Sequence, residues 1–507
     1  MTGAERPGYH FTAPSGHVND PLGVTWHATP DGGRYELFVQ HNPDAPEWAV
    51  ACRWGQTSAP DLVRWGPLST ALSPGEGEAG CWSGSVAVDD EGTPVIAYTR
   101  VTEDRVAVGS VVLATGEPTW RRWTADRDPV VPGPPEEDVV QFRDPFLLRH
   151  GGERLMVVGG GRADGTAAAW LYRSPDLRTW RPAGVLAERP SAATDPVGTG
   201  TAWECVQLVE VDGAWVLVVS VWDGDPRSVA CAVGDFDGAR FTARRWQRLS
   251  ATDLPYATTA FRDAQGRPCL LSWLREPGTA GDGWAGMLTV PWTVRVRDDR
   301  LHLAPHPDVA TLRTGSMARL AGPGATPSLP PSLDVEVTAP GPTALELHGS
   351  AGPVLRAEVD GDAVVLTPAG GTPVRLAGAS GTPALRLLLD AGMAEVFTSA
   401  GDHAALRLTG AGPLRLVVPE GAGPVAGDDT RPERGPRARR AGRGAAGGDA
   451  ARASADAAAA VPRRRRPGAG RVHQGGRRRH DRPGRGHPPA GRRALPHPVA
   501  QPRGGLL

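Results

Sequence analysis

One short segment occurs twice in the first 300 residues, and it limits the folds that this chain can adopt. Ser58–Trp65 reads Ser-Ala-Pro-Asp-Leu-Val-Arg-Trp and Ser174–Trp180 reads Ser-Pro-Asp-Leu-Arg-Thr-Trp, so that their shared prolines lie 115 residues apart. A fixed internal period is typical of folds that repeat one supersecondary unit. Two four-stranded propeller blades of about 58 residues would fill this interval, somewhat longer than the ~40–50 residues of common propeller repeats.

The sequence around these repeats predicts short β-strands. Tyr35–Val39, Val95–Tyr98, Arg154–Val158, Trp215–Val219 and Pro268–Trp273 are apolar or alternating runs between turns rich in Gly, Asp and Pro. No segment shows the pattern of a long amphipathic helix. About 290 residues of this kind predict an all-β domain in the form of a five-bladed β-propeller.

The distribution of aromatic residues divides the chain. All 16 Trp, all 5 Tyr and seven of the eight Phe precede residue 293, and Phe397 is the exception. We therefore predict the propeller domain at 1–295. Residues 310–425 alternate apolar and polar side chains between Gly/Pro turns, as in Leu333–Val337, which predicts a C-terminal β-sandwich.

Residues 427–507 form a low-complexity tail of Arg, Gly, Ala and Pro without Phe, Tyr or Trp. From Arg431 to Leu507 the tail holds 20 Arg against four acidic residues. We expect it to be disordered because it has too little apolar surface to fold. It lacks the aromatic residues on which single-stranded nucleic acids stack, so nucleic acid is an unlikely partner. The codons for Arg, Gly, Ala and Pro are GC-rich, and Lys is absent from the whole chain. Both facts favour a frameshift product of a GC-rich gene, which resequencing codons 415–430 would test.

The cysteines and the apolar runs of the sequence also bear on where in the cell the protein is expected. The five cysteines (Cys52, Cys81, Cys205, Cys231 and Cys269) are scattered without a C-x-x-C pair, against a disulfide framework or a Cys-type zinc site. No apolar run approaches the ~18 residues that span a membrane, and the first residues do not resemble a signal peptide. We expect a cytoplasmic protein with no membrane partner.

Three acidic motifs follow the blade spacing. They are Asn19-Asp20-Pro21, Arg143-Asp144-Pro145 and Trp203-Glu204-Cys205, and the acids lie 124 and 60 residues apart. Because equivalent strands of different blades line one channel, we expect the three carboxylates to meet at one end of it. Asn-Asp-Pro followed by Gly23 by itself predicts a tight turn rather than a strand.

Over roughly residues 5–425 the chain resembles glycoside hydrolase family 32, which contains invertases, sucrose-phosphate hydrolases, inulinases and levanases. The motifs that carry this resemblance occur in family order. They are Arg6–His10, Asn19–Pro21, Leu37–Pro43, Trp82–Ser85, Phe142–Pro145, Glu204–Cys205, Gly234–Gly238 and Ala394–Phe397.

The resemblance implies roles for the acids. Asp20 would be the nucleophile and Glu204 the acid/base of a retaining double displacement. Asp144, with Arg143 beside it, would hold fructose hydroxyls and stabilise the oxocarbenium-like transition state. No cofactor is implied, and His10 and His17 lack metal-ligand spacing, so we expect no metal. Further sugar contacts are predicted at Asn19, Gln40, Trp48, Trp82, Ser83, Tyr256 and Trp273.

The chain also departs from the family pattern. Leu22 replaces the second Asn of Asn-Asp-Pro-Asn-Gly, His17 replaces a Trp, Gln56 stands where His is usual, and Pro291-Trp292 replaces Pro-Arg. None of these changes removes a catalytic carboxylate, and we expect them to alter the shape of the pocket rim and so the choice of substrate.

We therefore predict a β-fructofuranosidase that acts on a small-molecule sugar, with sucrose as the expected substrate. Phosphorylated sucrose, inulin, levan and fructosyl transfer stay open, as does the oligomeric state. The alternatives are an inverting propeller glycosidase on arabinose or xylose polymers and a non-catalytic sugar-binding propeller.

Overall fold

Strands make up nearly all of the regular structure. The computed structural model describes residues 6–29, 32–275, 283–314, 323–326, 328–337, 342–360, 362–378, 385–409 and 413–419. These residues all belong to one compact unit. The predicted tail at 427–507 lies outside the described residues. The all-β prediction is confirmed, since the helix found among the described residues is the four-residue α1 (Pro307–Ala310).

Five sheets follow one another from Gly16 to Pro305, and the strands β1 to β16 pair in chain order, four to each of the first four sheets. The first two sheets contain β1 (Gly16–His27), β2 (Arg34–Asn42), β3 (Arg53–Ala59), β4 (Ser69–Leu72), β5 (Gly80–Val88), β6 (Pro94–Val101), β7 (Ser110–Gly116) and β8 (Trp123–Ala125). The next two contain β9 (Val139–His150), β10 (Glu153–Arg162), β11 (Thr166–Ser174), β12 (Arg181–Pro190), β13 (Ala202–Val211), β14 (Ala214–Trp222), β15 (Pro226–Phe236) and β16 (Phe241–Arg248). The fifth contains β17 (Pro255–Arg262), β18 (Pro268–Leu274), β20 (Met287–Leu288), β21 (Trp292–Arg297) and β22 (Arg300–Pro305).

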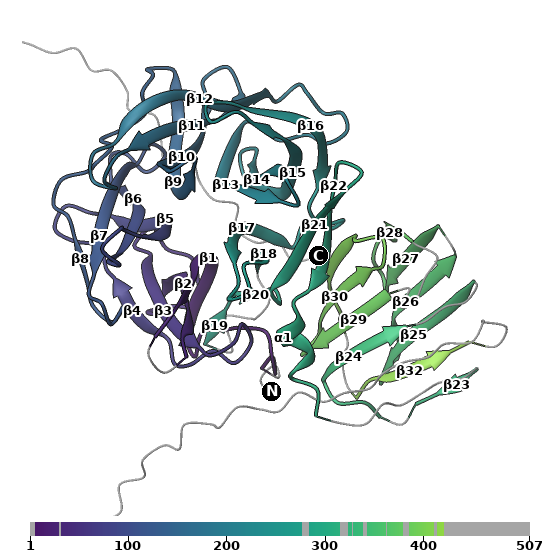
Figure 1. Ribbon diagram of the computed structural model, residues 1–507. Helices are drawn as coiled ribbons and strands as arrows, with labels where there is room; N and C mark the ends of the chain where they lie inside the picture. The colour runs from purple at the N-terminus through teal and green to yellow at the C-terminus, as the bar shows by residue number, and fades with distance from the viewer. Residues whose placement is uncertain are drawn as a thin grey trace, which may run out of the picture. The chain divides into compact units, whose positions relative to one another are not determined.

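The first strand of each sheet faces a common centre. Figure 1 shows the five sheets around that centre, with β1, β5, β9, β13 and β17 innermost. Each of these strands contacts the next, and β17 contacts β1. A cavity of about 360 Å³ is lined by residues from all five strands, among them Val24, Val86, Leu147, Leu208 and Ala260. Side chains on the five inner strands can therefore meet along one axis.

A short strand closes this ring. β19 (Trp284–Ala285) follows the second strand of the fifth sheet but pairs in parallel with β1 of the first sheet. Next to it, the amide of Leu288 donates to the carbonyl of Phe11 over 3.0 Å. The first and last sheets are therefore joined by backbone hydrogen bonds.

The repeated segment takes the same place in two sheets. Its copies follow β3 of the first sheet and β11 of the third, so the repeat interval is two sheets. In each copy an aspartate carboxylate, Asp61 or Asp176, accepts backbone N–H groups two and three residues further on. The recurrence of the motif thus reflects a recurring turn.

Two more sheets follow α1. They contain β23 (Gly324–Ala325), β24 (Ser332–Val337), β25 (Thr343–Gly349), β26 (Gly352–Asp360), β27 (Ala363–Pro368), β28 (Val374–Ala377), β29 (Leu385–Asp390), β30 (Met393–Thr398), β31 (His403–Arg407) and β32 (Arg415–Val418). One sheet has the order β23-β32-β25-β26-β27-β28 and the other β24-β29-β30-β31. Alternate residues from both, such as Leu333 and Leu345, share one apolar core. No helix of the described residues is both long and apolar enough to cross a membrane.

Candidate active site

Asp20 lies in a strand, and the predicted tight turn at Asn19–Pro21 is wrong. β1 runs through these residues, but its pairing with β2 shifts between Val18 and Pro21, so that Asn19 and Asp20 together oppose Gln40. Residues that favour turns also suit a β-bulge, which bends a strand and redirects a side chain without ending the pairing. The bulge therefore gives Asp20 its direction within a continuous strand.

Comparable irregularities occur on all five inner strands. The pairing shifts at Ser83 in β5, at Asp144-Pro145 in β9, at Cys205-Val206 in β13 and at Ala257-Thr258 in β17. Asp144, Cys205 and Ala257 have φ of 65°, 47° and 48°, in the left-handed region. Such conformations cost of order 1–3 kcal/mol in non-glycine residues and cluster at functional sites. Every inner strand thus presents a predicted site residue at or beside its bulge.

The Asp20 carboxylate is held by three donors. Asn19 Nδ2 donates to Oδ1 over 2.8 Å, and the Ser83 hydroxyl donates to Oδ2 over 2.5 Å. The thiol of Cys205 lies 3.7 Å from Oδ2. The site therefore joins side chains from β1, β5 and β13 on one carboxylate.

Asp144 is buried beside it. Its backbone N–H donates to the Thr99 hydroxyl over 2.7 Å, and its Oδ2 accepts the Cys205 backbone N–H over 2.9 Å. The Cys205 thiol is also 3.7 Å from this Oδ2. One sulfur atom therefore contacts the carboxylates of both aspartates.

Glu204 is clamped from two sides. Arg143 donates to its Oε1 from Nε (2.9 Å) and from Nη2 (2.6 Å), and the Tyr256 hydroxyl donates to Oε2 over 2.6 Å. The Arg143 guanidinium itself lies 5.6 Å from the ring centres of Trp82 and of Trp222. Cation–π contacts of this kind restrain a guanidinium in one orientation.

Aromatic and amide side chains border the acids. Trp48, 42% exposed, packs edge-on against Trp82 with ring centres 5.9 Å apart. Trp273 pairs with Tyr256 across β17 and β18, and its ring lies 5.9 Å from that of His17. Gln40 is buried and donates to the carbonyl of Cys81, next to Trp82. All eleven predicted site residues thus lie together, joined by direct contacts or through one neighbour.

Two glycines of β10 allow β13 to approach. A Cβ on Gly159 would lie 2.4 Å from the carbonyl oxygen of Trp203, and one on Gly161 would lie 2.3 Å from that of Thr201. Real Cβ atoms do not come so close, so β13 packs here only because both side chains are absent. The two glycines therefore let the backbone beside Glu204 lie directly against β10.

The sequence matches a known family over all five sheets that build this site. The family model "Glycosyl hydrolases family 32 N-terminal domain" matches residues 10–307. The chain belongs to glycoside hydrolase family 32. This confirms the family named on motif evidence, and the match includes Asp20, Asp144 and Glu204.

Named relatives cover part of this family 32 chain. It is 30% identical over 353 residues to beta-fructofuranosidase, insoluble isoenzyme 7, of Oryza sativa subsp. indica, an alignment that covers 61% of this chain and 56% of the rice protein. It is 31% identical over 330 residues to raffinose invertase of Escherichia coli, covering 61% and 66%. The chain thus matches little more than half of the rice relative.

A solved structure extends the likeness in fold. The GH32 beta-fructofuranosidase of Bombyx mori superposes with a TM-score of 0.74 at 24% identity, covering 85% of this chain and 94% of that chain. At this identity the match shows a shared fold, and it reaches beyond residue 307.

The family 32 site concentrates negative charge. Burial raises the pKa of Asp144 to about 7; Glu204 and Asp20 add to the rise, and Arg143 opposes it. Burial also raises the pKa of Asp20, with the Glu204 charge adding to the rise and the Ser83 hydrogen bond opposing it. Carboxyl groups this close together cannot all be ionised at once, so the three acids together keep a proton near neutral pH. Such a group can both supply a proton and present a carboxylate.

Sequence reasoning missed several partners in this family 32 site. Cys205 carries no signal of its own beyond its place after Glu204, although its thiol contacts both aspartates. Thr99 and Trp222 come from second strands of their sheets and carry no motif. Only the pairing of β5 with β6 and of β13 with β14 brings them to the acids.

Of the departures from the family pattern, His17 lies at the site. Burial and the neighbouring His41 lower the pKa of His17 to about 4. Leu22 and Trp292 are buried in apolar clusters, and Gln56 bonds Glu36 and the Trp120 carbonyl between two sheets. Most departures therefore affect packing rather than the pocket rim.

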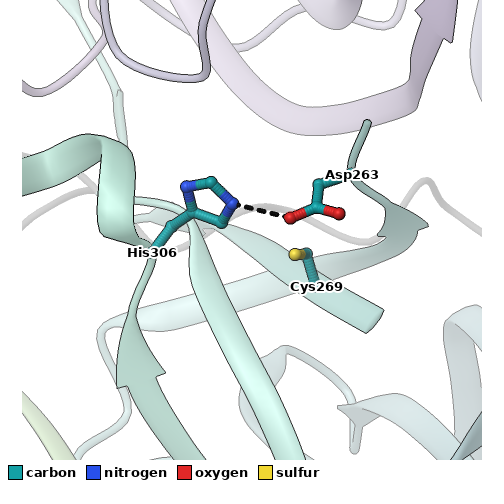
Figure 2. Close-up of side chains that lie close together, drawn as sticks. All are labelled: Asp263, Cys269 and His306. Carbon is teal, nitrogen blue, oxygen red and sulfur yellow. Dashed lines mark hydrogen bonds and ion pairs between the residues drawn. The ribbon is translucent and has the colours of Figure 1, made fainter. Parts of the chain in front are cut away.

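A cluster of residues apart from Asp20, Asp144 and Glu204 has the composition of a metal site. Figure 2 shows Asp263, Cys269 and His306 together, with potential ligand atoms within 4.8 Å of one another. However, His306 Nδ1 accepts the Asp308 backbone N–H, which places the ring proton on Nε2, facing Asp263 Oδ2 at 3.0 Å. Arg267 also donates to this carboxylate. A metal would have to displace both donors, and the cluster reads as a satisfied hydrogen-bond network.

Proposed function

We propose that this chain is a β-fructofuranosidase that releases terminal non-reducing β-D-fructofuranosyl residues, with sucrose as the expected substrate. The observation that carries the proposal is the convergence of Asp20, Asp144 and Glu204 from three of the five inner strands, β1, β9 and β13, with Cys205 touching both aspartates. The rice and Escherichia coli relatives are named as a beta-fructofuranosidase and an invertase. A variant of the Bombyx mori enzyme is described in complex with sucrose.

In the proposed reaction Asp20 attacks the anomeric carbon and the bond to the leaving oxygen breaks. Glu204 gives that oxygen a proton, and the fructosyl group becomes covalently bound to Asp20. Glu204 then takes a proton from water, which attacks the same carbon and releases fructose with retained configuration. Arg143 and Tyr256 position Glu204 for both steps.

Buried polar atoms at the site support a sugar ligand. For Asn19 Oδ1, His17 Nδ1 and Trp273 Nε1, no hydrogen-bond partner lies within the part of the chain that the structure describes. Buried polar atoms are normally paired, and sugar hydroxyls can both donate and accept. Asp144 would bind fructose hydroxyls beside them and stabilise the charge that develops on the ring.

The same proposal extends to the whole chain. The five sheets would be the blades of a five-bladed propeller; its predicted bounds of 1–295 end too early, because the fifth sheet runs to Pro305. The last two sheets would be a β-sandwich at 310–425. The sheet orders and the shared apolar core support this assignment. We keep the cytoplasmic location as part of the proposal. The family match does not favour the arabinose, xylose or binding-protein alternatives.

The test measures fructose release from sucrose, phosphorylated sucrose, inulin and levan by the wild type and by Asp20→Ala and Glu204→Ala. Loss of a group that acts in every turnover lowers kcat on the order of 10⁴-fold or more. Asp235→Asn is the matched control, because Asp235 is exposed and pairs with Arg244. Activity that survives Asp20→Ala would overturn the assignment of the nucleophile.

A further inference from the structure

A buried histidine joins the N-terminal segment to the C-terminal sheet. His10 Nδ1 lies 3.0 Å from Asp390 Oδ2 on β29, and Nε2 lies 2.8 Å from Glu395 Oε1 on β30. All three side chains are fully buried. Ionised carboxylates can only accept, so both ring nitrogens donate and the imidazole is positively charged.

Asp390 also fixes the backbone that leads up to His10. Its two oxygens accept the backbone N–H groups of Gly8 (2.6 Å), Tyr9 (2.9 Å) and His10 (2.9 Å). The Ser332 hydroxyl donates to the same carboxylate over 2.5 Å. One side chain of the C-terminal sheet thus orders the residues that lead into β1.

Glu395 fixes the segment that closes the ring of sheets. It accepts the Val290 backbone N–H over 2.7 Å and Trp292 Nε1–H over 3.0 Å. His403 Nε2, on β31, lies 3.1 Å from its Oε2. Three parts of the chain therefore meet at His10: the N-terminal segment, the closing segment and the C-terminal sheet. We call the group of His10, Asp390 and Glu395 the His10 clamp.

The clamp lies at the start of two routes to the carboxylates. In one route, Phe11 is bonded to Leu288, β19 pairs with β1, and β1 carries Asp20. In the other, β20 pairs with β18 at Trp273, whose partner in β17 is Tyr256. Tyr256 in turn holds Glu204. Both routes therefore run from residues that the clamp contacts to strands that carry or hold the proposed catalytic groups.

We propose that His10 is a positioning residue, whose charge binds the C-terminal sheet to the ring closure and thereby fixes β1 and β18 around the carboxylates. The kinetic part of this inference rests on the proposed function, and the structural part does not. Removing His10 would leave two buried carboxylates without their shared cation. Such unpaired charges destabilise a fold strongly.

The clamp also predicts a pH dependence. Hydrogen bonds to Asp390 and Glu395 outweigh burial and raise the pKa of His10 to about 9. The other titratable or charged groups around the clamp are His403, Tyr9, and Asp334 and Arg386, which act on Tyr9. A raised pKa means that His10 stabilises the fold fully below its unfolded pKa of about 6.5 and loses that contribution as pH rises through about 9.

The experiment compares the wild type, His10→Gln and His348→Gln. His348 is the matched control, because it pairs with Glu346 within the C-terminal sheets and its side chain is 30% exposed. We expect His10→Gln to lower Tm at pH 6 by about 10 °C and the difference from wild type to shrink towards pH 9.5. Hydrogen exchange of residues 16–27 should rise, and kcat on sucrose at a temperature well below Tm should fall more than KM changes. His348→Gln should follow the wild type.

A constant Tm difference across this pH range, or unchanged exchange in residues 16–27, would overturn the positioning role. If His10→Gln does not fold, the double variant His10→Gln/Glu395→Gln removes one unpaired carboxylate and is judged by the same exchange measurement. If the wild type releases no fructose, the proposed function fails, but the Tm and exchange results still decide the role of His10.

Discussion

At the scale of single residues, the hydrogen bond from Ser83 to Asp20 bears most directly on the charge state of the proposed nucleophile. Asp20 is buried close to Glu204, and both conditions raise its pKa. The Ser83 hydroxyl opposes them by donating to the carboxylate at 2.5 Å. Hydrogen bonds to ionised groups contribute about 1.5–3 kcal/mol. Ser83 therefore helps to keep Asp20 ionised and able to attack.

We predict that Ser83→Ala raises the pKa of Asp20 and moves the acidic limb of the kcat/KM profile to higher pH. At pH 6, kcat/KM should fall by roughly 10- to 100-fold, the rate equivalent of one charge-assisted hydrogen bond. The full pH–rate profile on sucrose measures both effects.

Ser85→Ala is the control for that measurement. Ser85 is buried two residues further along β5, where its hydroxyl contacts the backbone of Pro145 and Leu147. It should lower stability and leave the acidic limb in place. Equal shifts in both variants would contradict the role given to Ser83.

Residue identity could be predicted from the sequence only where a motif exists. Asp20, Asp144 and Glu204 were found because the residues around them are distinctive and their spacing follows the sheets. Thr99 and Trp222 could not be found, because an isolated Thr or Trp in a strand looks the same whether it supports a site or a core. Their role follows from strand pairing, which a single sequence does not encode in a short pattern.

At the scale of elements, the shared feature is an inner strand with a bulge. The bulges of β9, β13 and β17 each place a non-glycine residue in the left-handed region, and each lies at or beside a site residue. The apolar runs of the sequence correctly predicted strands, but the residues Asn19–Pro21 predicted a tight turn where the structure has a bulged strand. Turn-forming residues serve equally well in a bulge, and only the continued pairing of β1 with β2 distinguishes the two.

Gly159 allows a direct test of how β13 is placed. In Gly159→Ala the new methyl group would meet the Trp203 carbonyl oxygen, so β13 must move away from β10. We predict that kcat falls at least 10-fold and that the free energy of unfolding falls by about 1–3 kcal/mol, as in overpacked cores. Steady-state kinetics and denaturant unfolding measure the two effects.

Gly75→Ala serves as the comparison, because the nearest atom to its new methyl group would be 3.6 Å away on Glu78. It should change neither quantity. A fully active Gly159→Ala enzyme would show that β13 does not need this close approach.

At the scale of the whole molecule, the two groups of sheets are joined by ionic contacts between residues almost 400 positions apart. The sequence indicated both groups through the change in aromatic content and the period-2 pattern. The motifs around His10 and Glu395 are recognisable as family features in the sequence. Their contact could not be predicted, because neither motif indicates which distant residues it packs against. In the structure these two motifs contact each other in the buried His10 clamp.

The central claim is that Asp20 forms a covalent bond to the fructosyl group. In Glu204→Gln the general base is missing, so a fructoside with a good leaving group should load Asp20 faster than water can release the sugar. Acid quenching, proteolysis and mass spectrometry then locate the adduct. We predict the added mass of one fructosyl unit on the peptide that contains Asp20. An adduct on another residue, or fructose released with inverted configuration and no adduct, would contradict the account.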